Sequence, residues 1–318
     1  MMAFAARAMD LNLMPFVSVI VPNYNHARFL PERLNSVFQQ DFDNYEVILL
    51  DDKSTDNSAD VLASYASHPR VSHLILNESN SGSPFVQWQK GLELAKGEYI
   101  WLAESDDVAA PDFLSTLSAC VQSEHDIAIA FARSYRIDEH GNNQGFNAWG
   151  EVIEPLRWNK PFVNKGDNEI AHFLIHRNTI PNASAVLFRK DLGLQHITDI
   201  MNYRFCGDWL FWILLASHGK VAYRPDTFNY FRRYATATSL KRDKERLDAR
   251  FAEYNAVVKA AMDRKMPGAS APLQHDWMID EWIANKQHMS VWDFLMPPFS
   301  SPLRKRFYKA LFKRLIKR

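Results

Sequence analysis

Two groups of carboxylates carry most of the chemistry that this sequence suggests. Asp51 and Asp52 directly follow the apolar run 45–50, and an acidic cluster at residues 104–107 follows a second apolar run, 99–103. In an alternating βα segment, parallel strands end on one rim of the sheet, so carboxylates placed just after two strands can converge on one crevice. Converging carboxylates suggest a divalent cation together with a ligand that carries phosphate.

The cluster at 104–107 gives the stronger signal. It holds Glu104, Asp106 and Asp107 within four residues, and three such acids repel one another unless a cation or solvent compensates them. Mg²⁺ keeps few protein ligands and completes its shell with water and substrate phosphates, so a single carboxylate can be enough. An acidic solvated loop is the alternative for this segment, and a turn or helix cap is the alternative for the pair that follows 45–50.

An aromatic residue stands beside the end of the first apolar run. Tyr24 follows the run 17–21, and an aromatic ring at a strand end can stack on a nucleobase while a nearby carboxylate accepts hydrogen bonds from base or ribose. Ordinary packing of the tyrosine is the competing interpretation. The residue type alone does not decide between them.

The hydrophobic pattern predicts the elements that position these residues. Runs rich in β-branched residues alternate with stretches of helical periodicity. Strands are expected at 17–21, 45–50, 71–76, 99–103 and 127–132, and helices at 27–40, 56–65, 84–96 and from Pro111 onward. Four βα units in this order predict an α/β fold with a mostly parallel sheet flanked by helices and right-handed crossovers.

The pattern loosens after residue 132. Residues 139–166 are rich in Gly, Asn and Trp and are expected to form a long loop. Beyond it we expect a helix at 169–176, a strand at 183–189, an apolar helix at 209–217, strands at 221–224 and 228–233, and charged helices from 240 onward. We therefore divide the chain into an extension at 1–15, a domain at 16–238 and a helical C-terminal extension at 239–318.

Composition excludes several classes of protein. The 318 residues are 47% hydrophobic and 13% aromatic, which is ample for a core, and 37 basic residues balance 37 acidic ones, so no global charge favours nucleic acid. Two cysteines without metal-ligand spacing predict neither a disulfide framework nor a zinc site and suit a reducing cytoplasm. No apolar run reaches the roughly 18 residues that a membrane-spanning helix needs.

Several motifs, taken in order, resemble a known family. Residues 17–25, 50–58, 80–82, 97–100 and 102–107 look like the successive signatures of family 2 glycosyltransferases, which are inverting enzymes with the GT-A fold. The resemblance is close over 16–125 and fainter to about 240. It implies a nucleotide-sugar-binding half at 16–125 and an acceptor half at 126–238.

The resemblance also implies site residues. Asp106 would hold Mg²⁺ or Mn²⁺, because the D-x-D metal motif of the family falls on Glu104-Ser105-Asp106, with Glu in place of the first Asp. Lys90 would substitute for an arginine that the family carries near the donor, unless it is simply a solvated lysine. The other residues expected to contact the donor are Pro22, Tyr24, Asn25, Asp51, Asp52, Glu104 and Ser105.

A second carboxylate is expected to do the proton chemistry. The family often has Glu-Asp-Trp at the start of a helix in its acceptor half, and this chain has Gly207-Asp208-Trp209 followed by an apolar run. The resemblance makes Asp208 the catalytic base. A helix N-cap is the structural alternative, and the two roles are compatible.

The strand at 228–233 and the residue after it depart from the family. Arg232 and Arg233 could pair with diphosphate oxygens, although on an alternating strand only one of them should face the site. Tyr234 stands where relatives often have His, and a tyrosine hydroxyl does not replace imidazole as a metal ligand at neutral pH. A metal site assisted by histidine is therefore not expected from this segment.

The tail at 303–318 is a separate feature. It holds eight Lys or Arg and no acid, and on a helical wheel its apolar residues share one broad face. It resembles a helix that lies on an anionic membrane surface. Packing of the apolar face on the domain is the alternative.

The sequence therefore predicts an inverting glycosyltransferase that moves a sugar from a nucleotide-diphosphate sugar to a hydroxyl of a glycan or lipid-linked glycan. Family analogy suggests cell-surface polysaccharide or lipopolysaccharide synthesis in a bacterium, in the cytoplasm or at the inner face of the membrane. A dinucleotide-dependent oxidoreductase and a nucleotidyltransferase would both need a glycine-rich loop after the first strand, which residues 22–26 lack. A non-catalytic protein that binds nucleotide or glycan is the alternative, which the departures at Gly207 and Tyr234 leave open.

Overall fold

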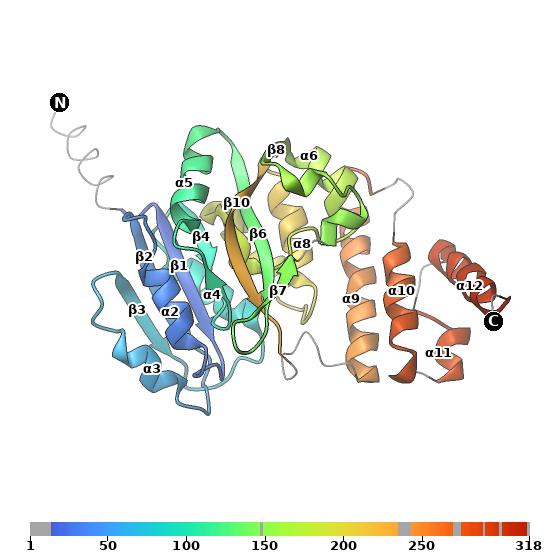
Figure 1. The fold of residues 1–318 in the computed structure, drawn as a ribbon, viewed down its shortest axis with the longest axis horizontal. Helices are drawn as coiled ribbons and strands as arrows, with labels where there is room; N and C mark the ends of the chain where they lie inside the picture. Colours follow the sequence, from blue (N-terminus) through green and yellow to red (C-terminus); the bar gives the residue numbers. More distant parts are fainter. Residues whose placement is uncertain are drawn as a thin grey trace.

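The computed structural model describes residues 14–146, 149–234, 243–269, 275–288, 290–298 and 301–316. A central sheet carries helices on both faces, and a group of helices stands at one end of it (Figure 1). The predicted α/β class, with a sheet flanked by helices and C-terminal helices beyond it, is confirmed. The segment 1–13 and the predicted boundary at 238 fall outside the described residues.

Four parallel strands form the first half of the sheet. Their order is β3 (Val71–Leu76), β2 (Tyr45–Asp51), β1 (Val17–Asn23) and β4 (Tyr99–Leu102). Every residue of β1, β2 and β4 is buried, as expected for parallel strands covered on both faces. Because β1 lies between β2 and β4, the carboxyl ends of both neighbours flank the end of β1.

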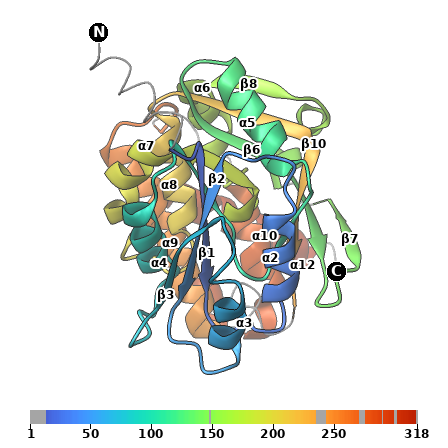
Figure 2. The ribbon, with the colours of Figure 1, turned by 90° about the vertical axis from the view of Figure 1, so that its left-hand side faces the viewer.

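Amphipathic helices close the two faces of this half. Figure 2 shows α4 (Pro84–Leu94) on one side of the strands and α2 (Leu30–Phe38) on the other. Ser83 caps α4 by accepting from the backbone N–H of Phe85, 3.3 Å away. The two short helices α3 (Ser58–Ser64) and α5 (Phe113–Ser123) complete the cover.

The second half of the sheet is mixed. β9 (Val186–Arg189) runs antiparallel between β4 and β6 (Ile127–Ile137), and β10 (Lys220–Arg232) pairs in parallel with β6. The two strands predicted at 221–224 and 228–233 are one strand, interrupted by a register shift between Arg224 and Phe228. The short strand β5 (Val108–Ala109) pairs with β10 at the edge.

The prediction of one long loop at 139–166 is wrong in part. That segment contains β7 (Asn143–Phe146), which pairs with β6, and β8 (Phe162–Lys165), which pairs with β10. Two 3-10 turns, Trp149–Val152 and Arg157–Asn159, lie between them. Strands of four residues are too short to show a clear period in a sequence rich in Gly and Asn.

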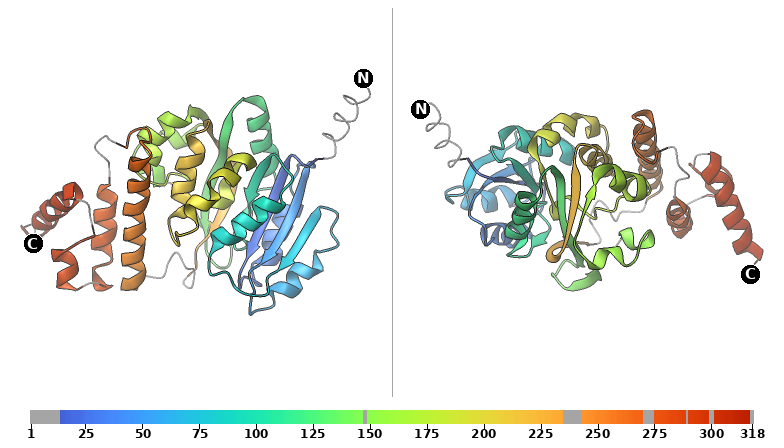
Figure 3. Two further views of the ribbon diagram at one scale, coloured as in Figure 1. Left: turned by 180° about the vertical axis from the view of Figure 1, so that it is seen from behind. Right: turned by 90° about the horizontal axis from the view of Figure 1, so that it is seen from above.

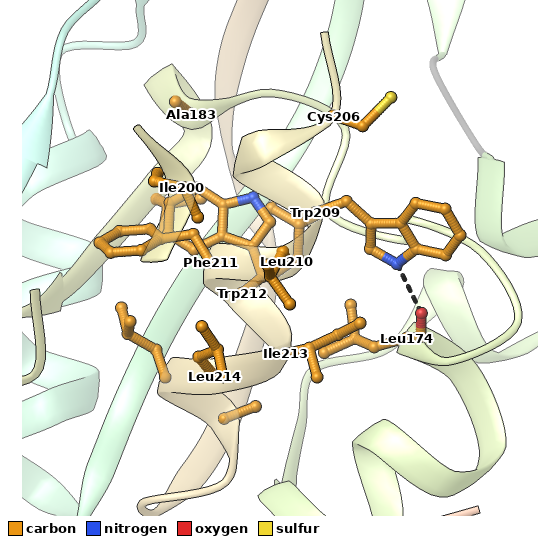
Figure 4. Packing of buried hydrophobic residues seen from close by; sticks show 14 of the residues in the cluster. Leu174, Ala183, Ile200, Cys206, Trp209, Leu210, Phe211, Trp212, Ile213 and Leu214 are labelled. Carbon is orange, nitrogen blue, oxygen red and sulfur yellow. Dashed lines mark hydrogen bonds between the residues drawn. The ribbon is translucent and has the colours of Figure 1, made fainter. Parts of the chain in front are cut away.

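Helix α8 (Gly207–Ala216) is apolar on all sides because other elements of the domain pack around it and bury nearly all of its residues. It is covered by α6 (Gly166–Glu169), the π turn Ile170–Leu174, α7 (Lys190–His196) and the 3-10 turn Ile197–Ile200. Figure 4 shows Trp209 directed away from Phe211 and Trp212, with its Nε1 donating to the carbonyl of Leu174 at 2.6 Å. This packing fixes the direction of α8 and hence the position of the residues in its first turn.

The C-terminal helices share the core of the domain. They are α9 (Lys244–Asp263), α10 (Asp276–Ala284), α11 (Val291–Leu295) and α12 (Ser301–Ile316), and Figure 3 shows them at the end of the molecule remote from β3. Phe251, Trp282 and Phe307 are each at most 1% exposed and belong to the same hydrophobic cluster as α8. No helix among the described residues is long and apolar enough to cross a bilayer.

Candidate active site

The two groups of carboxylates lie at the same edge of the sheet, as the sequence predicts. Asp51 is the register partner of Asn23 at the end of β1, and Asp52 N donates to Asn23 O at 2.9 Å. On the other side of β1, the N–H of Ala103 donates to the carbonyl of Ile20 at 2.8 Å, which places the acidic cluster 104–107 next. The two groups are therefore separated by the width of one strand.

Asp52 organises the loop after β3. It is 4% exposed, and its carboxylate accepts from Asn77 Nδ2 at 2.8 Å, from Gln87 Nε2 at 2.8 Å and from both the backbone and the hydroxyl of Ser81. Lys90 Nζ donates to Asn77 Oδ1, so this ammonium group belongs to the same network. Asp52 and Lys90 are therefore both tied to the loop after β3 through Asn77.

Asp51 and Asn25 shape the turn that presents Tyr24. Asp51 accepts from Asn23 Nδ2 at 2.7 Å and from Ser54 N at 2.9 Å, while Asn25 adopts a left-handed conformation with φ 58°. Asparagine is among the few residues that accept this backbone readily. Pro22 is buried below the turn, and Tyr24 is 46% exposed above it, where its ring is open to a ligand.

The acidic side chains of the cluster lie in a partly to fully buried setting. Glu104 accepts from Trp88 Nε1 at 2.8 Å, and Asp107 accepts from Asn182 Nδ2 at 2.7 Å and from the N–H of Arg232 at 2.9 Å. Burial first, and then the charge of Asp106, raise the pKa of Glu104 to about 8 and that of Asp107 to about 6. Like charges held this close would be stabilised by a cation.

A network that sequence reasoning missed surrounds Asp106. His26, from the turn after β1, places Nδ1 2.8 Å from Ser105 Oγ and Nε2 2.9 Å from the hydroxyl of Tyr234. That hydroxyl donates to Asp106 Oδ2 at 3.2 Å. The imidazole that relatives are expected to carry at the position of Tyr234 thus has a counterpart that reaches the cluster from β1. In the sequence, the signal for His26 was its position two residues after Tyr24.

The donor set at this edge fits a divalent cation that also binds substrate. Within the described part of the chain, no three His, Cys, Asp or Glu side chains converge to hold a metal by themselves. Asp106 is only half-buried, in contrast to Asp107, which is 2% exposed. A cation held by one carboxylate, with its other ligands from water and a diphosphate, matches these oxygen donors.

The two arginines at the end of β10 have different surroundings. Arg232 is 2% exposed, and its guanidinium donates to Asp106 O at 2.8 Å, to Asp138 O at 3.0 Å and to Glu32. The hydrogen bonds of the Arg232 guanidinium therefore go to protein groups, one of which is the backbone of the acidic cluster. Arg233 is half-buried and lines a cavity that it shares with Asp208, on the other side of the strand.

Asp208 lies in the first turn of α8 and faces that cavity of about 610 Å³. Its Oδ2 accepts from Asn178 Nδ2 at 3.2 Å and its Oδ1 from the N–H of Trp209 at 2.8 Å. Cys206 occupies the N-cap, so Asp208 is not the cap residue. Burial raises the pKa of Asp208 to about 6, which lies in the range where a carboxylate exchanges protons near neutral pH.

A carboxylate from α9 fixes the approach to α8. Glu253 accepts from three successive backbone N–H groups, those of Arg204 at 2.7 Å and of Phe205 and Cys206 at 2.8 Å. These residues immediately precede the turn that carries Asp208. Glu253 was not predicted, because nothing in a charged helical sequence distinguishes this glutamate from its solvated neighbours.

Packing explains why glycine precedes Asp208. A Cβ at Gly207 would lie 2.6 Å from Phe85 Cζ and 3.0 Å from Tyr203 Cβ, which is closer than real Cβ atoms approach. The ring of Phe85 on α4 therefore occupies the space that a larger side chain would need. The departure from the family pattern at this position follows from the packing of α4 against α8.

One short segment ties the acidic cluster to Asp208. Asn178 binds Asp208, and Asn182, four residues later, binds Asp107. Four residues span at most about 14 Å even when fully extended. The segment 178–182 therefore links the acidic cluster and Asp208 through one side chain at each of its ends.

These features define a protein of the GT-A class: a parallel half-sheet covered by helices, an acidic cluster after its fourth strand and a second buried carboxylate in the first turn of α8. The family model "Glycosyl transferase family 2" matches residues 18–183, so the chain belongs to that family.

Curated relatives match over part of their length. The glycosyltransferase GlyG of Streptococcus pneumoniae is 33% identical over 135 residues, which are 42% of this chain and 44% of GlyG. The poly(ribitol-phosphate) beta-N-acetylglucosaminyltransferase TarS of Staphylococcus aureus is 36% identical over 183 residues, 55% of this chain and 30% of TarS. The matched segments thus span less than half of each relative.

Solved structures share the fold. The crystal structure of S. aureus TarS 1-349 has a TM-score of 0.60 at 18% identity, and the match covers 88% of this chain and 75% of that one. The mannosyltransferase PcManGT from Pyrobaculum calidifontis, solved with GDP-Man and Mn²⁺, has a TM-score of 0.56 at 17% identity, with coverage of 86% and 72%. Both matches cover more of this chain than the family model, which spans residues 18–183.

Proposed function

We propose that this protein is an inverting, metal-dependent glycosyltransferase that moves a sugar from a nucleotide-diphosphate sugar to an acceptor hydroxyl. The observation that carries the proposal is the pairing of two carboxylate sites, the cluster 104–107 and Asp208, joined by the segment 178–182. Family membership supports the transferase class. Gly207 stands where the family often has Glu, and this difference had left a non-catalytic role open. The close packing of Phe85 against Gly207 supplies a structural reason for it.

The donor would bind across the ends of β1, β2 and β4. The nucleobase would stack at the exposed ring of Tyr24, with Asp52 and Lys90 shaping the pocket through their loop network. Asp106 would hold Mg²⁺ or Mn²⁺, and a bound cation stabilises the negative charge of a leaving diphosphate. The mannosyltransferase PcManGT, which shares the fold, binds Mn²⁺ together with GDP-Man, and this supports the choice of cofactor.

Asp208 would act as the general base. The acceptor hydroxyl oxygen forms a bond to the anomeric carbon, the bond from that carbon to the diphosphate oxygen breaks, and the hydroxyl proton passes to a carboxylate oxygen of Asp208. Attack from the side opposite the leaving group inverts the anomeric configuration. The pKa of about 6 leaves Asp208 largely ionised at neutral pH and still able to accept a proton.

The acceptor class is proposed from the relatives. TarS is named for poly(ribitol-phosphate), which supports a cell-surface polysaccharide or related polymer as the setting of this chain. A nucleotide-sugar donor and a cell-surface polymer as acceptor would suit a reaction at the inner face of the bacterial membrane.

The last two helices support peripheral binding to an anionic membrane. Leu303 and Phe307 of α12 pack on the core, whereas Phe312 is 65% exposed and lies on a helix that carries only basic charges. Trp292 and Met296 of the preceding segment are 72% and 74% exposed. Each Lys or Arg near an anionic surface contributes about 1 kcal/mol.

Co-sedimentation with vesicles tests the membrane proposal. We expect binding to phosphatidylglycerol vesicles, weakened by salt and by the double variant Trp292→Ala, Phe312→Ala, and no binding to phosphatidylcholine alone. Failure to bind anionic vesicles at low salt would refute it.

Single substitutions test the catalytic roles. Asp208→Asn should lower kcat by about 10²- to 10⁴-fold while leaving donor binding intact. Asp106→Asn should abolish the metal-dependent binding of the donor. Both are close in size to the native residue, so thermal midpoints should change little, and wild-type transfer by either variant would remove that residue from its role.

A further inference from the structure

The cavity that Asp208 faces lies between the second half of the domain and the C-terminal helices. Its volume is about 610 Å³, which suits one or two sugar rings. Residues of the acceptor half form one part of the lining and residues of α9 and α10 form the other. The lining includes Trp149, Arg177, Asp208, Phe231 and Arg233 from the first part, and Arg250, Tyr254, Trp277, Asp280 and Glu281 from the second.

Aromatic residues dominate the apolar part of this lining. Trp277 is held firmly, because its Nε1 donates to His176 O at 2.9 Å and its ring packs against Tyr254 with centroids 5.0 Å apart. Trp149 comes from a 3-10 turn and is half-buried. Rigid aromatic faces cover the apolar C–H faces of sugar rings at little cost in conformational entropy.

The polar part of the lining has both signs of charge. Arg177, Arg233 and Arg250 stand against Asp208, Asp280 and Glu281, so the formal charges cancel. Arg250 pairs with Glu281 at 3.6 Å, and Glu281 also accepts from the hydroxyl of Tyr254 at 3.1 Å. A lining without net charge does not favour an anionic ligand. Hydroxyl groups, which both donate and accept, can pair with guanidinium and with carboxylate groups.

We propose that this cavity binds the acceptor as an uncharged sugar unit, and that α9 and α10 supply one wall of the acceptor site. The inference rests on the proposed function, because it takes Asp208 as the base that faces the acceptor hydroxyl. It gives the C-terminal helices a direct part in acceptor recognition. It also places Arg233 on the acceptor side, away from the donor diphosphate.

Direct binding tests this proposal without any need for turnover. The probes are methyl glycosides of glucose, galactose, mannose and N-acetylglucosamine, titrated against the full chain by intrinsic tryptophan fluorescence, with glycerol 3-phosphate as the anionic probe. We expect at least one glycoside to bind saturably and more tightly than glycerol 3-phosphate. Trp149→Ala and Trp277→Ala should each weaken binding about tenfold, the size expected for one aromatic contact.

Two further variants separate binding from folding. Leu156→Ala, an exposed position in the same segment as Trp149, should leave binding unchanged, and Trp277→Phe should restore most of the affinity lost in Trp277→Ala. No saturable glycoside binding, tighter binding of glycerol 3-phosphate, or equal behaviour of Trp149→Ala and Leu156→Ala would overturn the proposal.

Donor hydrolysis keeps the two proposals apart. Trp149→Ala should raise the KM for the acceptor about tenfold. Leu156→Ala should leave both this KM and the rate of donor hydrolysis, with water as acceptor, at the wild-type values. Glycoside binding without any donor binding or hydrolysis would refute the proposed function and leave the saccharide site standing. Donor hydrolysis with no glycoside binding would refute the site alone.

Discussion

The substitution Glu253→Gln probes how far the position of Asp208 depends on α9. Glu253 receives three backbone N–H groups from residues 204–206 at 2.7 to 2.8 Å, directly before the turn that carries the base. Glutamine keeps one acceptor oxygen and presents an amide N–H₂ where the second oxygen was. At least one of the backbone N–H groups of residues 204–206 then loses its acceptor and lies against the amide N–H₂ of the glutamine, which is also a donor.

The expected loss follows from these contacts. A hydrogen bond to a charged group contributes about 1.5 to 3 kcal/mol, so losing one of them should lower the free energy of unfolding by about that amount, and losing two by roughly 3 to 6 kcal/mol. Displacement of the turn by about 1 Å would lower kcat by about 10²-fold. Removing the charge also removes one of the influences, after burial, that raise the pKa of Asp208, so the acid limb of the rate should move to lower pH.

The assay is urea unfolding together with the pH profile of kcat. Asp248→Asn is the matched control, because Asp248 lies on the same helix and forms an exposed ion pair with Lys244, of a kind that contributes at most about 1 kcal/mol. If Glu253→Gln matches this control in both stability and kcat, the reasoning that α9 positions the base is wrong.

Three further predictions follow from the site. The kcat of the wild type should rise with pH through an acid limb near the pKa of Asp208, about 6, because burial raises that pKa and only the ionised form accepts a proton; a limb near 4 in the pH profile would contradict this. Gly207→Ala should destabilise the fold by about 1 to 3 kcal/mol through its clash with Phe85, measured by thermal or urea unfolding, and a neutral result would mean that α4 yields easily. Tyr234→Phe removes the hydroxyl shared with His26 and should raise the metal concentration needed for half-maximal activity while its ring stays packed; an unchanged metal titration would show that the network does not position the cluster.

The parallel half of the sheet could be predicted from the sequence because its signals are local. Buried parallel strands read as continuous apolar runs, and the residues that follow them fall at one edge by the rules of βα topology. The convergence of Asp52 and Asp106 on the two sides of β1 is therefore a consequence of strand order. The order of the motifs along the chain indicated the family.

The partners of individual side chains could not be predicted in the same way. Arg232 and Arg233 are adjacent in sequence, and side chains alternate between the two faces of a strand. Arg232 contacts the acidic cluster, and Arg233 lines the cavity at Asp208. The sequence does not say which arginine lies on which side. His26, Glu253 and Asn178 became visible only through contacts between segments that are 30 or more residues apart.

The C-terminal helices were expected to form a separate extension, and their packing gives them a larger part. Phe251 and Trp282 join the cluster around α8, with ring centroids 4.8 Å apart, and Trp277 lines the cavity at Asp208. A helical wheel identifies an apolar face, but it does not identify the surface that covers it. For α12 the face is divided, since Phe307 is buried and Phe312 is exposed.

The central claim is that Asp106 holds a cation that binds the diphosphate of a nucleotide sugar. Its most direct test is a calorimetric titration of UDP-, GDP-, dTDP- and CMP-sugars into wild type and Asp106→Asn, with and without Mn²⁺. The account predicts that one nucleotide class binds the wild type only when Mn²⁺ is present, and that Asp106→Asn loses this binding while remaining folded. Binding that is equally tight without the cation, or unchanged in the variant, would contradict it.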